Sequence, residues 1–259
     1  MSSARPTRRL PFATAAKIGI SSSNRSAAYA RHWLGTLGGH AGHSLKDADI
    51  AIVGGDEAAD ADCVIRLWDF QVGYPGSGTL ASAASGAASV IGHKSGAGVP
   101  LPGDIPEKWC GMYGVILALA EAWRRRDGTA KTVAYDVSAA VILRSFSLQN
   151  SGGREEMVHS WRRNGRLCVD HGGIFPMGFY ACKDGYVALL GRSRRDWHNI
   201  RMAIGNPEWA RSEAFQDPFI LARDSAKADI LLEKTLSSYS RDQLLQQGLA
   251  EEAVIAPVY

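Results

Sequence analysis

Apolar residues near the start of the chain follow a strand–helix–strand succession. The apolar stretches are residues 17–20, 26–37, 48–53 and 63–67. Within the second stretch, Tyr29, Trp33 and Leu37 stand four residues apart, which is the spacing of one face of a helix. The other stretches are short and continuous, as buried strands are, and the first ends in a Ser- and Asn-rich cap cluster. This succession predicts a βαβ unit in a parallel sheet.

The middle of the chain predicts two helices built largely from small and apolar residues. Residues 80–92 are rich in Ala, Ser and Gly with apolar residues at helical spacing, which favours a helix over a low-complexity linker. Residues 96–103 are expected to form a loop. Residues 111–126 predict a long helix, and the arginines at 124–126 complement the negative end of its dipole. A phosphate contact is the alternative role for these arginines.

The last third of the chain predicts a smaller α+β part. Asp184-Gly185 stands between two apolar runs, and this dipeptide favours a tight hairpin turn. The sequence Gly-Asn-Pro at 205–207 ends the amphipathic segment before it, as expected of a helix stop. Two further helices are expected at 224–236 and 241–247.

Composition and charge narrow the class of protein. The net charge of +3 does not suggest nucleic acid, and 46% hydrophobic residues suffice for a buried core. The four cysteines lack CxxC spacing, which favours buried reduced thiols over disulfides or zinc, and no histidine has metal-ligand spacing. No apolar run reaches the ~20 residues of a membrane span. The basic start at 1–9 precedes no signal core, so we expect a cytoplasmic protein.

Several stretches, taken in order, resemble one enzyme family. They are the glycine-containing run 172–187 with its Tyr-x-x-Lys-Asp-Gly-Tyr-Val, Ile-Gly-Asn-Pro-Glu-Trp at 204–209, and the segments 111–128, 135–138, 240–248 and 253–258. Their order and spacing resemble the class III coenzyme A transferases, the CaiB/BaiF family. The resemblance covers residues 76–259, and residues 1–75 follow it in outline.

This resemblance implies an α/β fold with a Rossmann-like parallel-sheet large domain followed by a small α+β domain. We place an abbreviated CoA-binding domain at 1–168 and the small domain at 169–259. The implied reaction moves coenzyme A from an acyl-CoA to a carboxylic acid, with CoA and acyl-CoA as substrates and no permanently bound cofactor. An α-methylacyl-CoA racemase-like enzyme and a non-catalytic subunit of a heteromer are the alternatives.

The family's nucleophile is a carboxylate, usually an Asp about four residues before the opening Gly of the long small-residue helix. Counting back from Gly111 gives Glu107, whereas counting back from Gly128 ends between Asp104 and Glu107. Either acid is therefore a candidate. The structural alternatives are that Asp104 caps a helix with Pro106 in its first turn, and that Glu107 is a first-turn acid favoured by the helix dipole.

The resemblance also implies roles for a glycine loop and for a partner chain. His171, Gly172 and Gly173 are candidates for a loop whose backbone N–H groups stabilise an oxyanion. Family members form interlocked dimers and continue beyond the last matched segment, so we expect a homodimer or a heteromer with a chain that supplies this return segment. The heteromer is favoured because self-association leaves both copies without the segment. Outside the site, Asp136 is expected to cap a helix begun near Ser138. The remaining expected core or pocket-wall residues are Tyr135, Phe179 and Tyr180.

Overall fold

The structure, a computed structural model, describes residues 16–259 except 22, 40–42, 94 and 147–173. The chain divides into two compact units, 1–163 and 164–259, and each is described by itself. The predicted domain limit between 168 and 169 lies outside the described residues and stays a prediction.

The first unit is built on a four-stranded parallel sheet with the order β1-β2-β3-β4. Its strands are β1 (Ile18–Ile20), β2 (Ile50–Gly54), β3 (Cys63–Trp68) and β4 (Val133–Ser138). All five residues of β2 are buried, as expected for a central strand of a parallel sheet. Helix α1 (Arg25–Thr36) connects β1 to β2, which confirms the predicted βαβ unit.

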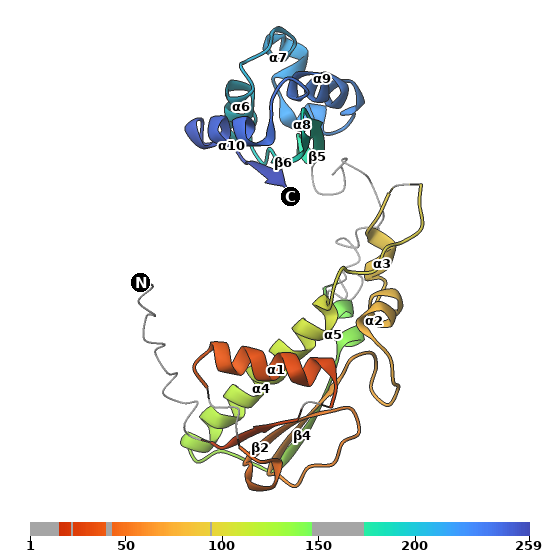
Figure 1. Ribbon diagram of the computed structural model, residues 1–259, viewed down its shortest axis with the longest axis vertical. Helices are drawn as coiled ribbons and strands as arrows, with labels where there is room; N and C mark the ends of the chain where they lie inside the picture. The colour runs from red at the N-terminus through yellow and green to blue at the C-terminus, as the bar shows by residue number, and fades with distance from the viewer. Residues whose placement is uncertain (1–15, 22, 40–42, 94, 147–173) are drawn as a thin grey trace. The chain divides into compact units, whose positions relative to one another are not determined.

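The sheet is covered differently on its two faces. On one face, α1 and the long helix α4 (Ile105–Arg126) lie side by side, as Figure 1 shows. On the other face, the 3-10 turn η1 (Leu45–Asp47) and the connection 55–62, which is described throughout and contains no helix, cover part of β2 and β3. The remaining helices among the described residues of this unit are α2 (Gly78–Ala84), α3 (Ala87–Val90) and α5 (Ala139–Ser145).

Two glycines let α4 lie close to its neighbours. A Cβ at Gly111 would lie 2.5 Å from the backbone oxygen of Ser26 and 2.7 Å from the backbone nitrogen of Ala30, both on α1. One turn further, a Cβ at Gly114 would lie 2.9 Å from the side chain of Leu67 on β3. Since real Cβ atoms cannot occupy these positions, the small residues of α4 fix its distance from both α1 and the sheet.

Three predictions for the first unit are corrected by the structure. The long helix begins at Ile105 instead of 111, because proline is tolerated in a first turn, where no N–H is needed. The helix expected at 80–92 is interrupted between α2 and α3, where Gly86 has a φ of 85°. Asp136 caps no helix: its carboxylate accepts a hydrogen bond from the Trp68 indole, and Ser138 caps α5 instead.

The second unit pairs a three-stranded antiparallel sheet with helices, which confirms the expected α+β part. The sheet order is β5 (Met177–Cys182), β6 (Gly185–Leu190) and β7 (Ile255–Val258). The helices described from residue 174 onward are α6 (Arg194–Ala203), α7 (Glu208–Arg211), η5 (Glu213–Phe215, a 3-10 helix), α8 (Pro218–Leu221), α9 (Ala226–Leu236) and α10 (Arg241–Ala250). The predicted turn joins β5 to β6, and Gly205 and Asn206 follow α6 with positive φ.

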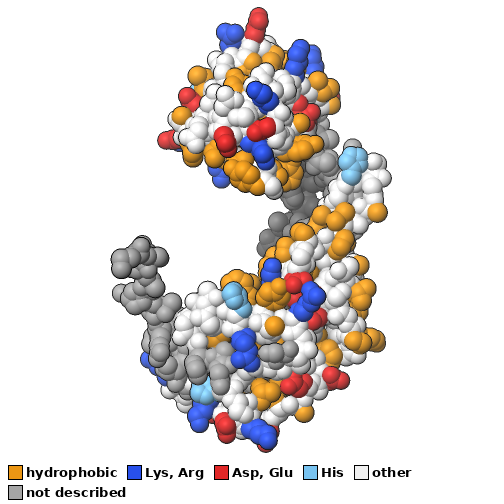
Figure 2. All heavy atoms as spheres, viewed as in Figure 1, with side chains coloured by type: hydrophobic (Ala, Val, Ile, Leu, Met, Phe, Trp, Pro, Cys, Tyr) orange, Lys and Arg blue, Asp and Glu red, His pale blue; other side chains and the backbone are white. Residues whose placement is uncertain are grey.

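Whether an aromatic strand residue enters the core depends on the face of the sheet to which its side chain points. Tyr180 is fully buried and Tyr135 of the first unit packs against that unit's core, as expected. Phe179 is 64% exposed, so the predicted core position is wrong, and its pocket-wall role stays a prediction. Because side chains alternate along a strand, Phe179 and Tyr180 must point to opposite faces. Figure 2 shows apolar side chains gathered on the surface of this unit.

The described cysteines are free thiols. Cys63 and Cys110 are buried in the first unit, and burial raises the pKa of each thiol to about 12. Cys182 is half-buried, and Cys168 lies outside the described residues.

The helix contact at Gly111 predicts a stability loss on adding one methyl group. We expect Gly111→Ala to destabilise the first unit by about 1–3 kcal/mol because backbone on α1 cannot move aside. The matched control is Gly35→Ala on α1, where a Cβ meets nothing within 4 Å. It should be neutral or stabilising by up to about 1 kcal/mol. Urea unfolding measures both, with hydrogen exchange of α1 amides locating the effect; equal stabilities would contradict the packing account.

Candidate active site

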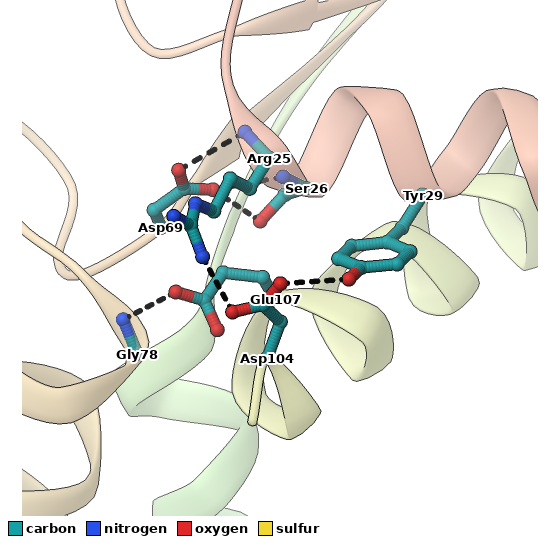
Figure 3. Close-up of polar contacts among 7 residues, drawn as sticks. All are labelled: Arg25, Ser26, Tyr29, Asp69, Gly78, Asp104 and Glu107. Atoms are coloured by element: carbon teal, nitrogen blue, oxygen red, sulfur yellow. Dashed lines mark hydrogen bonds and ion pairs between the residues drawn. The ribbon is translucent and has the colours of Figure 1, made fainter. Parts of the chain in front are cut away.

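The structure brings both predicted acids to the start of α4, beside the first turn of α1. Asp104 directly precedes the helix, and Glu107 lies in its first turn. Figure 3 shows the two carboxylates among residues from α1, from the end of β3 and from the start of α2. His171, Gly172 and Gly173 lie outside the described residues, so their part in the site stays a prediction.

Asp104 is held by two donors from α1. Its Oδ2 accepts a hydrogen bond from the Tyr29 hydroxyl at 2.8 Å, and its Oδ1 accepts one from Arg25 Nη1 at 2.5 Å (Figure 3). Asp104 occupies the N-cap position of α4 with Pro106 in the first turn, as the structural alternative expected, but its carboxylate makes no capping bond to the helix. The Tyr29 hydrogen bond, with the charges of Arg25 and Lys108, holds the pKa of Asp104 below its ordinary value. The side chain is 32% exposed, so the site combines an ionised carboxylate with access from outside.

Glu107 has a different environment from Asp104. The residue is 3% exposed, and its Oε1 accepts a hydrogen bond from the backbone N–H of Gly78 at 2.6 Å. Its Oε2 is buried without a hydrogen-bond partner among the described atoms. A Cβ at residue 78 would overlap the carboxylate, so the glycine is what lets α2 approach α4 here. Glu107 thus joins the start of α2 to the first turn of α4.

Asp69 organises the first turn of α1. It follows β3, and its carboxylate accepts hydrogen bonds from the backbone N–H groups of Arg25 and Ser26 and from the Ser26 hydroxyl (Figure 3). Asn24 accepts from the N–H of Ala27 at 2.9 Å. These contacts satisfy the free N–H groups of the helix start and fix where Arg25 leaves the backbone.

A hollow of about 590 Å³ with three carboxylates in its lining lies beside this turn, where β1, β2 and β3 end. Its lining comes from the loops after these strands: Ser23, Asn24, Gly54, Gly55, Asp56, Glu57, Trp68, Asp69, Gly73, Tyr74, Pro75 and Gly76. Burial raises the pKa of Glu57, but hydrogen bonds from Ser21 and Ser23 outweigh it and leave the pKa below its ordinary value. Ligands of open α/β sheets bind at the carboxyl ends of the strands. Because Asp69 lines the hollow and also contacts Arg25, the hollow adjoins the acid pair.

The described residues hold no group of three His, Cys, Asp or Glu side chains suited to a metal ion. Within the same part of the chain, every helix is too short or too polar to cross a lipid bilayer.

These observations define a class of protein: an α/β protein with an accessible carboxylate ahead of a long helix. The family model described as CoA-transferase family III matches residues 71–259, and the chain belongs to that family. This match confirms the resemblance that the sequence shows over 76–259. No curated protein sequence matches the chain.

Solved structures agree on the fold. A CAIB/BAIF family protein from Brucella suis is 17% identical, with a TM-score of 0.66. The match covers 92% of this chain and 64% of the Brucella suis chain. The hypothetical protein Rv3272 from Mycobacterium tuberculosis is 16% identical with a TM-score of 0.64, covering 83% and 62%. An orthorhombic form of Rv3272 is 14% identical with a TM-score of 0.72, covering 94% and 81%. The chain thus spans less than two thirds of the protein chain in the first two of these structures.

The sequence named both acids as candidates but not the residues that bond them in the structure. Tyr29 was visible as part of a helical face, but its hydroxyl meets an acid 75 residues later in the chain. Asp69 and Gly78 carried no local signal, because their contacts with the helix starts exist only after the sheet and helices pack.

The contact between residue 78 and Glu107 predicts non-additive stability effects. Gly78→Ala should destabilise the first unit by about 1–3 kcal/mol, since the methyl group displaces a buried carboxylate from its hydrogen bond. Adding Glu107→Ala removes the overlap, so the double variant should lose less than the sum of the two single variants. Urea unfolding of the four proteins measures the coupling. Strictly additive losses would show that the two residues do not interact.

Proposed function

We propose that the protein transfers coenzyme A from an acyl-CoA to a carboxylic acid, with Asp104 as the nucleophile. The observation that carries the proposal is the environment of Asp104: an ionised, partly exposed carboxylate held by Tyr29 and Arg25 at the start of α4. A carboxylate that is well oriented and not fully hydrated is a competent nucleophile. Membership of CoA-transferase family III supports the substrate class.

The proposed reaction is balanced without a further reactant. The Asp104 carboxylate attacks the thioester carbonyl, and the C–S bond breaks. CoA leaves as a thiolate, and a mixed anhydride of the acyl group and Asp104 remains. The thiolate then attacks the Asp104 carbonyl carbon, which releases the donor acid and leaves an aspartyl-CoA thioester. The acceptor carboxylate then attacks the aspartyl-CoA thioester and displaces the CoA thiolate, which gives a second mixed anhydride. The thiolate attacks the acceptor carbonyl of this anhydride, which forms the new acyl-CoA and regenerates the Asp104 carboxylate. The loop of His171, Gly172 and Gly173 is proposed to donate N–H groups to the oxyanions.

Glu107 is proposed to support the site instead of reacting. Its carboxylate is almost fully buried and is bonded to the Gly78 N–H, so an acyl-CoA cannot reach it without displacing α2. A racemase-like reaction needs an acid and a base on opposite sides of the α-carbon. The burial of Glu107 therefore favours transfer over racemisation for this pair of acids.

The hollow is proposed to receive the uncharged adenine and ribose groups of CoA, since its three carboxylates would repel the CoA phosphates. It lies at the carboxyl ends of the parallel strands, and Asp56, Glu57 and Asp69 can accept hydrogen bonds from hydroxyl and amino groups. Asp69 lines the hollow and accepts from the backbone N–H of Arg25, whose side chain donates to Asp104, and this supports a position near the proposed nucleophile.

We further propose that the protein works as an oligomer, as a homodimer or with a second chain, in the cytoplasm. Exposed Phe179 and Tyr186 on the sheet of the second unit support association, because large apolar side chains gathered on a surface are common at protein contacts. A non-catalytic subunit remains the alternative to an enzyme.

The nucleophile assignment predicts where an enzyme-bound thioester forms. After mixing with an acyl-CoA, borohydride trapping and peptide mass mapping should place the modification on Asp104. Asp104→Asn should lose the modification and reduce turnover at least ~10³-fold, since it removes the covalent route. Glu107→Gln is the matched control, because its amide oxygen can still accept from Gly78, and it should keep the modification.

Two outcomes would contradict this proposal. A modification on Glu107, or full turnover by Asp104→Asn, would show that Asp104 is not the nucleophile. Calorimetric titration of Asp104→Asn with CoA separates binding from chemistry, and we expect this variant to bind CoA without turnover. If the unmodified protein also binds CoA but shows no turnover, the non-catalytic subunit is favoured.

A further inference from the structure

The two donors on α1 hold different oxygens of Asp104 and differ in their own surroundings. Tyr29 reaches Oδ2 and Arg25 reaches Oδ1, from positions one helical turn apart. The Arg25 side chain is 66% exposed, so it can leave its position at little cost. Tyr29 is half-buried beside the α1–α4 contact, where its Cβ lies 3.0 Å from the position of a Cβ on Gly111. Lys108 lies over its ring, 5.5 Å from the centroid.

We propose that Tyr29 is the fixed donor to the oxygen that becomes the Asp104 carbonyl, and that Arg25 moves away to release the oxygen that attacks. The assignment rests on the proposed function, in which Asp104 is the nucleophile. It gives the two carboxylate oxygens separate roles during the reaction.

The chemistry of the second step shows what Tyr29 would contribute. When Oδ1 has attacked the acyl carbon and the C–S bond has broken, Oδ1 is the bridging oxygen of the anhydride and Oδ2 is the carbonyl oxygen of Asp104. Attack of the CoA thiolate on Cγ moves the carbonyl electron pair onto Oδ2. The Cγ–Oδ1 bond then breaks, the pair on Oδ2 re-forms the carbonyl, and Oδ1 leaves within the donor carboxylate. A hydroxyl already bonded to Oδ2 stabilises the negative charge that collects there.

The donor role of Tyr29 also bears on pH dependence. The charged and titratable groups near Asp104 are Arg25 and Tyr29 of α1, Glu107 and Lys108 of α4, and Asp69, which contacts the backbone of Arg25. Tyr29 favours the ionised form of Asp104, and its own pKa is raised by the same hydrogen bond. Removing the hydroxyl should therefore raise the pH at which Asp104 becomes ionised and active.

The test compares two tyrosines that each donate to a carboxylate. Tyr29→Phe keeps the ring and its packing, and it should slow formation of the Asp104–CoA thioester about 100-fold in single turnovers. Its acid limb of kcat/KM should move to higher pH. Tyr135→Phe is the matched control, because the Tyr135 hydroxyl donates to Glu121 at 2.7 Å on the same unit. It should change neither quantity, and Arg25→Gln should slow the step less than Tyr29→Phe.

Each result decides between the inference and the proposed function. If the unmodified protein forms the thioester on Asp104 and Tyr29→Phe matches it in rate and pH limb, this inference is overturned while the proposed function stands. A larger loss in Arg25→Gln than in Tyr29→Phe would reverse the assigned roles and overturn it as well. If the unmodified protein forms no thioester on Asp104, the proposed function fails and this inference fails with it.

Discussion

The close contact of α1 and α4 at Gly111 is the constraint on which the candidate site depends. Backbone atoms of Ser26 and Ala30 occupy the space that a side chain at residue 111 would need. This distance lets the Tyr29 hydroxyl reach the carboxylate that precedes α4. The sheet contributes from the other side, because Asp69 at the end of β3 bonds the first turn of α1. The packing of small residues therefore fixes the position of the Asp104 carboxylate.

The two acids at the start of α4 show how burial separates residues with the same chemistry. Asp104 keeps access from outside and bonds side-chain donors, which suits a group that must react and be regenerated. Glu107 is enclosed and bonds a backbone N–H, which suits a group that joins two helices. Their environments, more than their distance from a family motif, are the basis on which Asp104 is proposed as the nucleophile and Glu107 as its support.

Much of the fold could be predicted from the sequence, because local patterns determine it. The spacing of Tyr29, Trp33 and Leu37 indicated α1, and Asp184-Gly185 indicated the hairpin turn. The range 111–126 began the long helix at its first glycine and so missed its true start, although the capping alternative for Asp104 had already placed Pro106 in a first turn. The contacts of Asp69, Gly78 and Tyr29 could not be predicted, since each joins residues at least 29 positions apart and depends on tertiary packing.

The central claim, that helix packing holds Asp104 as an ionised carboxylate, can be measured without catalysis. Carbon-13 NMR of the Asp carboxyl groups, with the signal assigned by its loss in Asp104→Asn, gives the titration midpoint of this group. The account predicts a midpoint below the ordinary value of about 3.9 and a rise toward it in Gly111→Ala, while Gly35→Ala changes nothing. An ordinary midpoint in the unmodified protein, or one that Gly111→Ala leaves in place, would contradict the account.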